Sequence, residues 1–157
     1  PRYLSSAASD VYKRQRIGDV NDAAKKIHQK LKEIESSTKP TAIVWGGETT
    51  VKIKGSGLGG RNQELALIVA ELAHQDPIRK SWTFLSGGTD GRDGPTEAAG
   101  AIVDQETCKR ILNEGYQVYD FLAENNSNKA LKISNDLLHT GATGTNVADV
   151  QILIVSQ

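Results

Sequence analysis

The segment with the strongest chemical signature is Gly55-Ser56-Gly57-Leu58-Gly59-Gly60, which runs directly into Arg61-Asn62. Backbone N–H groups of such a loop can approach a phosphate closely, and the start of a following helix adds partial positive charge. The glycine spacing fits a dinucleotide-binding pattern, but the acidic residue expected about 20 positions later is missing. A tight turn between a strand and a helix explains the same glycines, so both interpretations stay open.

Arg61 favours the anion-binding interpretation of this segment. A helix dipole disfavours a cation at the first helical position unless an anion is bound there as well. A guanidinium can hold a carboxylate or a phosphate through two parallel N–H groups. A Walker-type phosphate loop is excluded, because Arg61 and Asn62 stand where Lys and Ser or Thr are required. A surface salt bridge from Arg61 to Glu64 is the alternative.

Two further loops carry candidate ligands. Asp90 and Asp93 lie in a tight turn, Thr89–Gly94, and could hold magnesium, which takes one or two carboxylates together with phosphate oxygens and water. Arg92 excludes an EF-hand, and turn formation by the two aspartates is the alternative. The segment Thr140–Asn146 is small and rich in hydroxyl groups, which suits either a second phosphate loop or a plain surface loop.

Several classes of protein are excluded by composition. The 157 residues carry 19 basic and 19 acidic side chains, so there is no general attraction to nucleic acid or acidic membranes. The apolar runs are too short to cross a bilayer. A lone Cys108 excludes a disulfide framework, the three histidines lack the spacing of a zinc site, and no Gly-x-Ser-x-Gly motif indicates a serine hydrolase.

The elements that must position these loops follow from hydrophobic periodicity. A helix is predicted from Ile17 to about Ile34, and strands at Ala42–Trp45 and Val51–Ile53 are separated by Gly46-Gly47. The later elements, in order, are a helix over Arg61–His74, strands at Trp82–Leu85 and Ala101–Val103, helices over Gln105–Asn113 and Val118–Glu124, an amphipathic piece after Asn128, a short strand at Leu137-Leu138 and a final buried strand at Val147–Val155. This alternation predicts an α/β fold, a layered sheet of about five to six strands flanked by helices. Ligands bind at the carboxyl ends of strands in such sheets, and the glycines cluster there.

Residues 1–15 show no periodicity and no signal-peptide pattern, so a non-native or disordered leader is expected there, with the domain spanning residues 16–157. The chain contains no Met, which suggests that Pro1 is not a natural N-terminus.

Four segments in this order resemble one known domain: Gly46-Gly47-Glu48-Thr49-Thr50, Gly57-Leu58-Gly59-Gly60-Arg61-Asn62-Gln63-Glu64, Gly88–Thr96 and Thr143-Gly144-Thr145-Asn146-Val147. They are similar to the C-terminal domain called MOFRL of the D-glycerate 2-kinase family, whose members are often labelled hydroxypyruvate reductase. The resemblance covers roughly Ile17 to the C-terminus. Ala142 stands where the family usually has Pro, and Asn126 stands where an Asp is common.

The resemblance implies ATP-dependent phosphorylation of D-glycerate at its 2-hydroxyl, with Mg2+, in a cleft between two domains. Arg61 would be the catalytic residue that clamps the glycerate carboxylate or the transferred phosphoryl group. Asp90 and Asp93 are the candidate metal ligands. The implied substrate- and phosphate-binding residues are Gly57, Gly59, Gly60, Asn62, Glu48, Thr49, Thr89, Asp90, Thr143, Thr145 and Asn146.

The resemblance also implies a partner. The family's N-terminal kinase domain, which supplies a catalytic lysine and much of the nucleotide site, is missing from this sequence, so the chain alone is expected to be inactive. A cytoplasmic enzyme that does not bind nucleic acid or membranes is expected, and a homodimer is one expectation for its assembly. Two alternatives stay open: an NAD(P)H-dependent hydroxypyruvate reductase and a non-catalytic structural module.

Overall fold

The computed structural model describes residues 15–156. The leader expected at residues 1–15 falls almost entirely outside this range, and Gln15 itself belongs to the first strand. Within the described residues, no helix is long and apolar enough to cross a membrane.

The fold is a mixed six-stranded sheet in the order β1-β2-β6-β3-β4-β5, which confirms the predicted class. Only β1 and β2 pair in parallel, and every other neighbouring pair is antiparallel. The strands are β1 Gln15–Asp19, β2 Thr41–Thr50, β3 Trp82–Gly88, β4 Gly100–Asp104, β5 Leu137–Leu138 and β6 Asp149–Val155.

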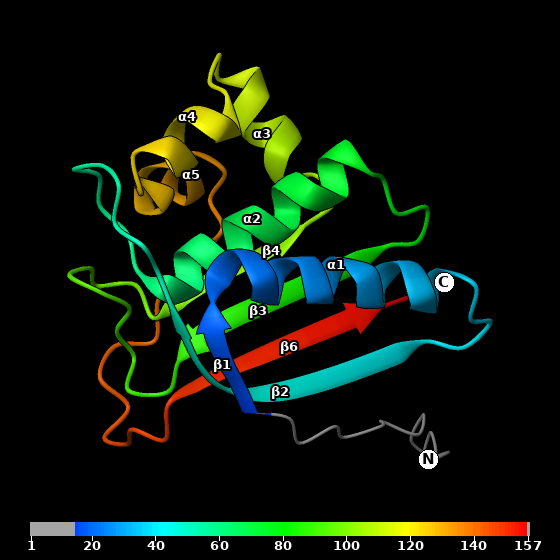
Figure 1. The fold of residues 1–157 in the computed structure, drawn as a ribbon, viewed down its shortest axis with the longest axis horizontal. Coiled ribbons are helices and arrows are strands. Elements are labelled where there is room, and N and C mark those ends of the chain that lie inside the picture. The colour runs from blue at the N-terminus through cyan, green and yellow to red at the C-terminus, as the bar shows by residue number, and fades with distance from the viewer. Residues whose placement is uncertain (1–14, 157) are drawn as a thin grey trace, which may run out of the picture.

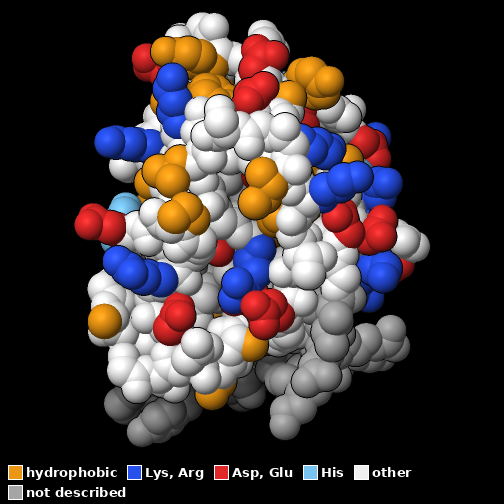
Figure 2. Space-filling model, turned by 60° about the vertical axis from the view of Figure 1, so that its left-hand side comes forward, with side chains coloured by type: hydrophobic (Ala, Val, Ile, Leu, Met, Phe, Trp, Pro, Cys, Tyr) orange, Lys and Arg blue, Asp and Glu red, His pale blue; other side chains and the backbone are white. Residues whose placement is uncertain are grey.

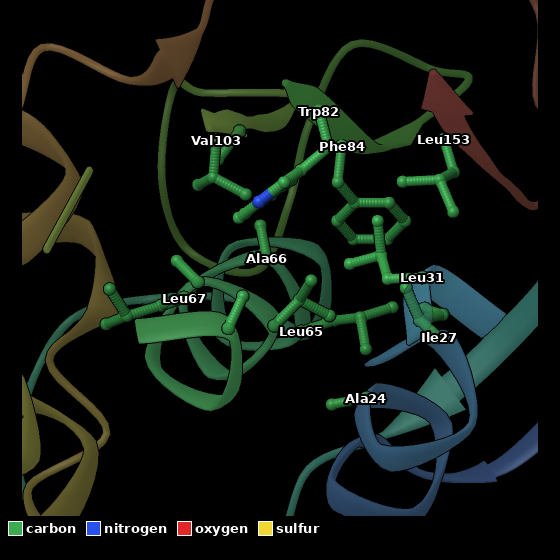
Figure 3. Close-up of a cluster of buried hydrophobic side chains, with 14 of the residues drawn as sticks. Ala24, Ile27, Leu31, Leu65, Ala66, Leu67, Trp82, Phe84, Val103 and Leu153 are labelled. Carbon is green, nitrogen blue, oxygen red and sulfur yellow. The ribbon is translucent and has the colours of Figure 1, made fainter. Parts of the chain in front are cut away.

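Two long helices, α1 (Val20–Glu35) and α2 (Arg61–Gln75), lie side by side over one face of the sheet (Figure 1). Three short helices follow beyond α2: α3 (Thr107–Asn113), α4 (Val118–Ala123) and α5 (Ser127–Ile133). The core fills the space between the two long helices and the sheet (Figure 3). Its fully buried side chains include Ile27, Leu31, Leu65, Leu67, Phe84 and Leu153. Burying each of these side chains away from water stabilises the folded state by about 1.5–3 kcal/mol.

The start of the first helix differs from the sequence prediction. Residues Gln15–Asp19 pair with Gly46–Thr50 as a parallel strand, and α1 begins at Val20, so Ile17 is not helical. The carboxylate of Asp19 accepts a hydrogen bond from the backbone N–H of Asn21 at 2.8 Å and caps the helix. Ile17 therefore has the spacing of the apolar residues of α1, but it lies in the strand that precedes the helix, and Asp19 separates the two.

The second strand also differs. The prediction of two strands separated by Gly46-Gly47 is wrong, because β2 runs through both glycines to Thr50, and Val51–Ile53 has no strand assignment. Gly47 has a φ of +132°, a backbone conformation that other residues rarely adopt. Gly47 also pairs with Asp149 of β6, so the glycine lets the strand continue where a turn was expected.

Within residues 15–156 the helices cover one face of the sheet only. On the opposite face Val44, Ile152, Leu85 and Ile102 lie in one register row across four strands. Val44, Ile102 and Ile154 are exposed large hydrophobic residues on this face. We call this row, together with Ile154, the open face.

The strand directions bring the sequence motifs to one edge of the sheet. Because β6 runs antiparallel between β2 and β3, the carboxyl ends of β2 and β3 meet the beginning of β6. Asp149 pairs with Gly47 on one side and with Gly88 on the other. The first turn of α2 and the loops that follow β2 and β3 lie at the same edge, on the left of Figure 1.

Candidate functional site

Arg61 is the centre of this edge. Its Nε lies 2.7 Å from Oδ2 of Asp149, and its Nη2 lies 2.9 Å from Oδ1 of the same carboxylate. Its Nη1 lies 3.2 Å from Oε1 of Glu48. Arg61 therefore forms a bidentate pair with one carboxylate and a single contact with another.

The two carboxylates differ sharply in their exposure. The side chain of Asp149 is 0% exposed and that of Glu48 is 60% exposed, while Arg61 lies between them at 33%. The hydrogen bonding of Arg61 to the accepting carboxylate of Asp149 is the main reason that the pKa of Arg61 is raised. On the side of the molecule shown in Figure 2, basic and acidic side chains lie next to each other near the centre. Asp149 thus fixes the guanidinium from within, and Glu48 contacts it from the solvent side.

The alternative salt bridge from Arg61 to Glu64 is not formed. Glu64 is buried, and its Oε1 accepts a hydrogen bond from Nδ2 of Asn125 at 3.0 Å. Burial raises the pKa of the Glu64 carboxyl. Glu64 therefore belongs to the packing between α2 and the segment before α5.

Asp93 caps the start of α2. Its carboxylate accepts hydrogen bonds from the backbone N–H groups of Asn62 and Gln63, at 3.1 and 2.8 Å, and from the side-chain amides of both residues, at 3.2 and 3.0 Å. Asp93 is 1% exposed, and burial raises the pKa of its carboxyl in spite of these hydrogen bonds. The helix start that was expected to receive a ligand anion is thus occupied by an anion of the protein. This arrangement explains Asp93 and Asn62 structurally, and their roles as metal ligand and ligand-binding residue stay predictions.

The glycine loop packs closely against the segment between α4 and α5. The backbone N–H of Gly57 donates to the carbonyl of Glu124 at 2.8 Å, and that of Leu58 donates to Oδ1 of Asn126 at 3.2 Å. A Cβ at Gly57 would lie 2.4 Å from the Glu124 carbonyl oxygen, and one at Gly59 would lie 2.2 Å from Oγ of Ser127. The glycines here permit a close approach of two backbone segments.

Asn126, which departs from the family pattern, has a local role in this packing. Its side-chain oxygen accepts the hydrogen bond from Leu58, and the preceding Asn125 uses its own oxygen to accept from Lys54 and Gly55, at 2.6 and 3.2 Å. The departure therefore leaves an acceptor in place for the loop backbone.

The loops that follow β3 and precede β6 are joined to each other. The hydroxyl of Thr89 donates to the carbonyl of Ala148 at 2.6 Å and accepts from the backbone N–H of Val147 at 2.8 Å. The hydroxyl of Thr143 donates to the carbonyl of Thr89. Gly91 has a φ of +87°, and a Cβ there would lie 1.9 Å from the carbonyl oxygen of Gly141. These contacts hold the two loops as one unit beside Arg61 and Asp149.

The remaining predicted site residues fall into two groups. The first group lies in these loops and has local contacts: Asp90, Thr145 and Asn146. Oδ1 of Asp90 accepts a hydrogen bond from the backbone N–H of Arg92. Oδ1 of Asn146 accepts one from the backbone N–H of Ala148. Thr145 donates its backbone N–H to the Thr143 hydroxyl at 3.4 Å. Thr49 instead points inward, 3% exposed, and its hydroxyl has no hydrogen-bond partner among the described residues. The structure thus groups Glu48, Arg61 and the joined loops, and it separates Thr49 from them.

Asp149 is the site residue that sequence reasoning missed. It stands within Val147–Val155, for which the sequence pattern predicts one buried strand, and it is the first residue of the observed strand β6. A carboxylate at the start of a mostly apolar strand needs a partner when it is buried, and that signal could have singled it out. The run also contains Gln151, fully buried with neither amide atom partnered among the described residues.

Residues 15–156 contain no group of three or more His, Cys, Asp or Glu side chains that could hold a metal ion. Asp90 is the expected ligand whose carboxylate stays partly exposed, and Asp93 has its carboxylate directed at N–H donors.

Comparison with known proteins gives consistent matches. The model of the MOFRL family matches residues 41–149. The chain is 45% identical over 142 residues to the D-glycerate 2-kinase of Thermotoga maritima, which covers 87% of this chain and 33% of that protein. It is 49% identical over 120 residues to human glycerate kinase, covering 74% of this chain and 23% of the human protein.

Solved structures agree with these relatives. The crystal structure of glycerate kinase from Thermotoga maritima matches with a TM-score of 0.88 at 41% identity, over 94% of this chain and 36% of that one. A Pyrococcus horikoshii protein matches with a TM-score of 0.83 at 40% identity, over 94% of this chain and 34% of that one. The chain therefore spans about a third or less of the length of these relatives.

Proposed function

Because the chain belongs to the MOFRL family, we propose that it forms the anion-binding part of an ATP-dependent glycerate 2-kinase. The observation that carries this proposal is the geometry of Arg61, which Asp149 holds in place while Nη1 faces the exposed Glu48. The names of the relatives support the substrate, since they are glycerate kinases and D-glycerate 2-kinases. They do not favour the reductase alternative.

The proposed reaction moves a phosphoryl group between two oxygens. The 2-hydroxyl oxygen of D-glycerate attacks the terminal phosphorus of ATP, the bond from that phosphorus to the bridging oxygen breaks, and the hydroxyl proton is released. The products are 2-phosphoglycerate and ADP. Such a transfer depends mainly on positioning and on stabilising negative charge.

Arg61 would supply both effects at this edge. A guanidinium fixed by a buried carboxylate does not have to reorient during the reaction, and this preorganisation makes it effective on developing charge. Its Nη1, together with the Nη2 N–H that Asp149 leaves free, offers two parallel N–H groups that suit the glycerate carboxylate or the transferred phosphoryl group. The joined loops around Thr89 and Thr143 would line the same edge.

A resident magnesium ion is not well supported by the described residues. The Asp93 carboxylate accepts four N–H hydrogen bonds and is buried, so it does not fit the role of a metal ligand. Asp90 offers one partly exposed carboxylate. We therefore derive no step through magnesium, and a role for Asp90 beside the phosphates of ATP stays a prediction.

We further propose that the remaining part of the kinase polypeptide completes the active site. The chain matches only about a third of the Thermotoga maritima relative. The residues that bind the nucleotide base and activate the hydroxyl would come from the other part, so the isolated chain should bind anionic ligands without turning over. A cytoplasmic location and a homodimer stay predictions.

Ligand binding by the chain tests the proposal directly. We expect 2-phosphoglycerate to raise the melting temperature of the chain, because binding to the folded state stabilises it by mass action. Arg61→Ala should abolish this shift, and Arg79→Ala, which removes an exposed arginine far from the site, should leave it unchanged. Equal shifts for the wild type and Arg61→Ala would contradict the role of Arg61, and the absence of any shift in the wild type would favour the structural-module alternative.

Replacing the matched third of the Thermotoga maritima kinase with residues 15–156 gives a hybrid for activity measurements. ATP-dependent phosphorylation of D-glycerate is expected, and Arg61→Ala should lower its rate by a factor of about 100 to 1,000, a typical loss when a charge-stabilising donor is removed. Oxidation of NAD(P)H with hydroxypyruvate by the hybrid would instead support the reductase.

A further inference from the structure

The geometry points to Glu48 as an internal competitor: we propose that its carboxylate occupies the ligand position on Nη1 of Arg61 and is displaced when an anionic oxygen of the substrate binds. This inference rests on the proposed function, because it concerns the same site. It assigns the ligand chemistry, a carboxylate or phosphoryl oxygen, and it gives Glu48 and Asp149 opposite roles.

The hydrogen-bonding capacity of Arg61 carries the first step. The Nε and Nη2 groups lie 2.7 and 2.9 Å from the two oxygens of Asp149, so this edge of the guanidinium is fully used. The Nη1 group remains for another acceptor, and Glu48 reaches it at 3.2 Å through one oxygen. Nη1 carries two N–H groups and Nη2 has one more that Asp149 leaves free, so an anion that binds through two parallel N–H groups uses Nη1 and meets Glu48 there.

Exposure decides which of the two carboxylates can leave. Asp149 has a 0% exposed side chain, and removing its arginine would leave a buried charge without a partner, which is costly. Glu48 is 60% exposed and can return to water at little cost, because exposed ion pairs contribute little free energy. Displacement of Glu48 is thus the easy change, and Asp149 acts as a positioning residue that keeps Arg61 oriented.

The charge balance supports the same conclusion. With Glu48 and Asp149 in contact, the single positive charge of Arg61 faces two carboxylates, and Asp93 lies near enough to influence the pKa of Arg61 as well. A further anion gains little attraction from such a group. When Glu48 moves away from Nη1, the attraction of Arg61 for a further anion is restored. The Arg61–Glu48 pair therefore selects ligands that can outcompete a carboxylate side chain.

Glu48 has a simple alternative role, that of a surface salt bridge that stays formed in the ligand complex. A third possibility is that Glu48 itself holds the substrate through a hydroxyl group. The three roles predict different signs for one measurement, the change in ligand affinity when the carboxylate becomes an amide of the same shape.

The experiment uses the 157-residue chain, labelled with 15N, and follows two signals during titration. The Nε–Hε resonance of Arg61 reports on the guanidinium, and the backbone amide resonances report binding in every variant, including Arg61→Ala. Inorganic phosphate and D-glycerate are titrated separately at constant ionic strength, so that the phosphoryl and carboxylate oxygens are distinguished. We expect Glu48→Gln to lower the dissociation constant of at least one ligand about fivefold, the scale of an exposed ion pair. Glu97→Gln, at an exposed carboxylate elsewhere, should leave it unchanged.

Asp149→Asn tests the positioning role in the same titration. We expect weaker binding together with a shifted Arg61 Nε–Hε resonance in the ligand-free chain, because a donating NH2 group replaces one of the two oxygens that accept from Arg61. An unchanged resonance and unchanged affinity would remove Asp149 from the inference. Circular dichroism of each variant establishes that the fold is retained.

The outcomes separate this inference from the proposed function. If Arg61→Ala abolishes binding while Glu48→Gln binds as the wild type does, Glu48 is a plain salt bridge and only this inference fails. If Glu48→Gln binds more weakly, Glu48 holds the ligand and the inference is overturned. If neither the wild type nor Glu48→Gln binds either anion, or if Arg61→Ala still binds, the proposed function itself fails.

Discussion

Two loops of this chain resemble each other in sequence and differ in how they are held. The glycine loop Gly55–Gly60 and the loop Thr140–Asn146 are both small, polar and rich in glycine. The first donates its backbone N–H groups to Asn125, Glu124 and Asn126 and runs into a helix start capped by Asp93. The second lies exposed and is fixed mainly through the hydroxyl of Thr143.

The difference shows that a glycine-rich loop has two uses that composition alone does not separate. In the glycine loop, the missing side chains make room for another backbone segment. In the loop Thr140–Asn146, Gly141 and Gly144 have φ values of +67° and +74° and open space around the Cβ position, so they serve chain reversal. Distant neighbours, rather than the loop sequence, decide which use applies.

The largest expected effect tests the packing of the glycine loop. A Cβ at Gly60 would lie 2.3 Å from Cγ of Asp93 and 2.5 Å from its backbone carbon, so the chain must shift to accept it. We expect Gly60→Ala to lower the free energy of unfolding by about 3 kcal/mol, measured by urea denaturation. Gly144→Ala, with open space but a positive φ, should cost about 1 kcal/mol. Equal costs would remove the distinction between the two loops.

The next effect concerns the cap of α2. Asp93→Ala removes the acceptor of two backbone and two side-chain N–H groups in a buried place. We expect a loss of about 2–3 kcal/mol in unfolding free energy. Asp90→Ala is the matched control, because Asp90 accepts from one backbone N–H in a more exposed turn and should lose less than about 1 kcal/mol. A small loss for Asp93→Ala would indicate that water replaces the carboxylate.

A smaller effect is expected in the other loop. Thr143→Val removes the hydroxyl that donates to the Thr89 carbonyl and accepts from the backbone N–H of Thr145. We expect a loss of about 1 kcal/mol and faster hydrogen exchange in residues 140–147. The control is Thr140→Val, where the lost hydrogen bond is to the adjacent Gly141. Unchanged exchange would show that the loop is fixed by its other contacts.

The smallest effect is a change in pH dependence at Glu64. Burial raises the pKa of this carboxyl above its ordinary value of 4.5, so its contribution to stability is fully present below pH 4.5 and is lost as the pH rises through the folded-state pKa. Glu64→Gln should remove this pH-dependent loss of stability, because the amide does not ionise. The variant should therefore gain stability relative to the wild type as the pH rises above 4.5 in urea titrations. Glu97→Gln, an exposed control, should show no such trend, and a parallel trend in both variants would contradict the assignment.

The fold class and most elements could be predicted because their signals are local. The helix at Arg61 and the strands at Trp82 and Ala101 follow from periodicity within a few residues. The strand at Gln15–Asp19 could not be recognised, since it exists through pairing with β2 and its residues also fit the helical pattern that follows. Gly46-Gly47 was misinterpreted for a similar reason, because pairing on both sides keeps β2 extended there.

The candidate site was predictable in part. Arg61 stood out because a cation at a helix start requires an anion, and the structure supplies one from an unexpected place. Asp149 is 88 residues away in sequence, so no local pattern could connect the two. The capping role of Asp93, 31 residues from Asn62, was hidden in the same way. Local chemistry can identify a group that needs a partner, but the fold determines which partner it receives.

The open face has a consequence for the thermodynamics of the chain. Its row of Val44, Ile152, Leu85 and Ile102 is already in contact with water in the folded state of the isolated chain. Unfolding therefore hydrates less new apolar surface than it would with both sheet faces covered. The heat-capacity change on unfolding should lie below the usual range of about 12–15 cal/mol/K per residue. The temperature dependence of its stability would be correspondingly flat, a signature that calorimetry can measure without any ligand.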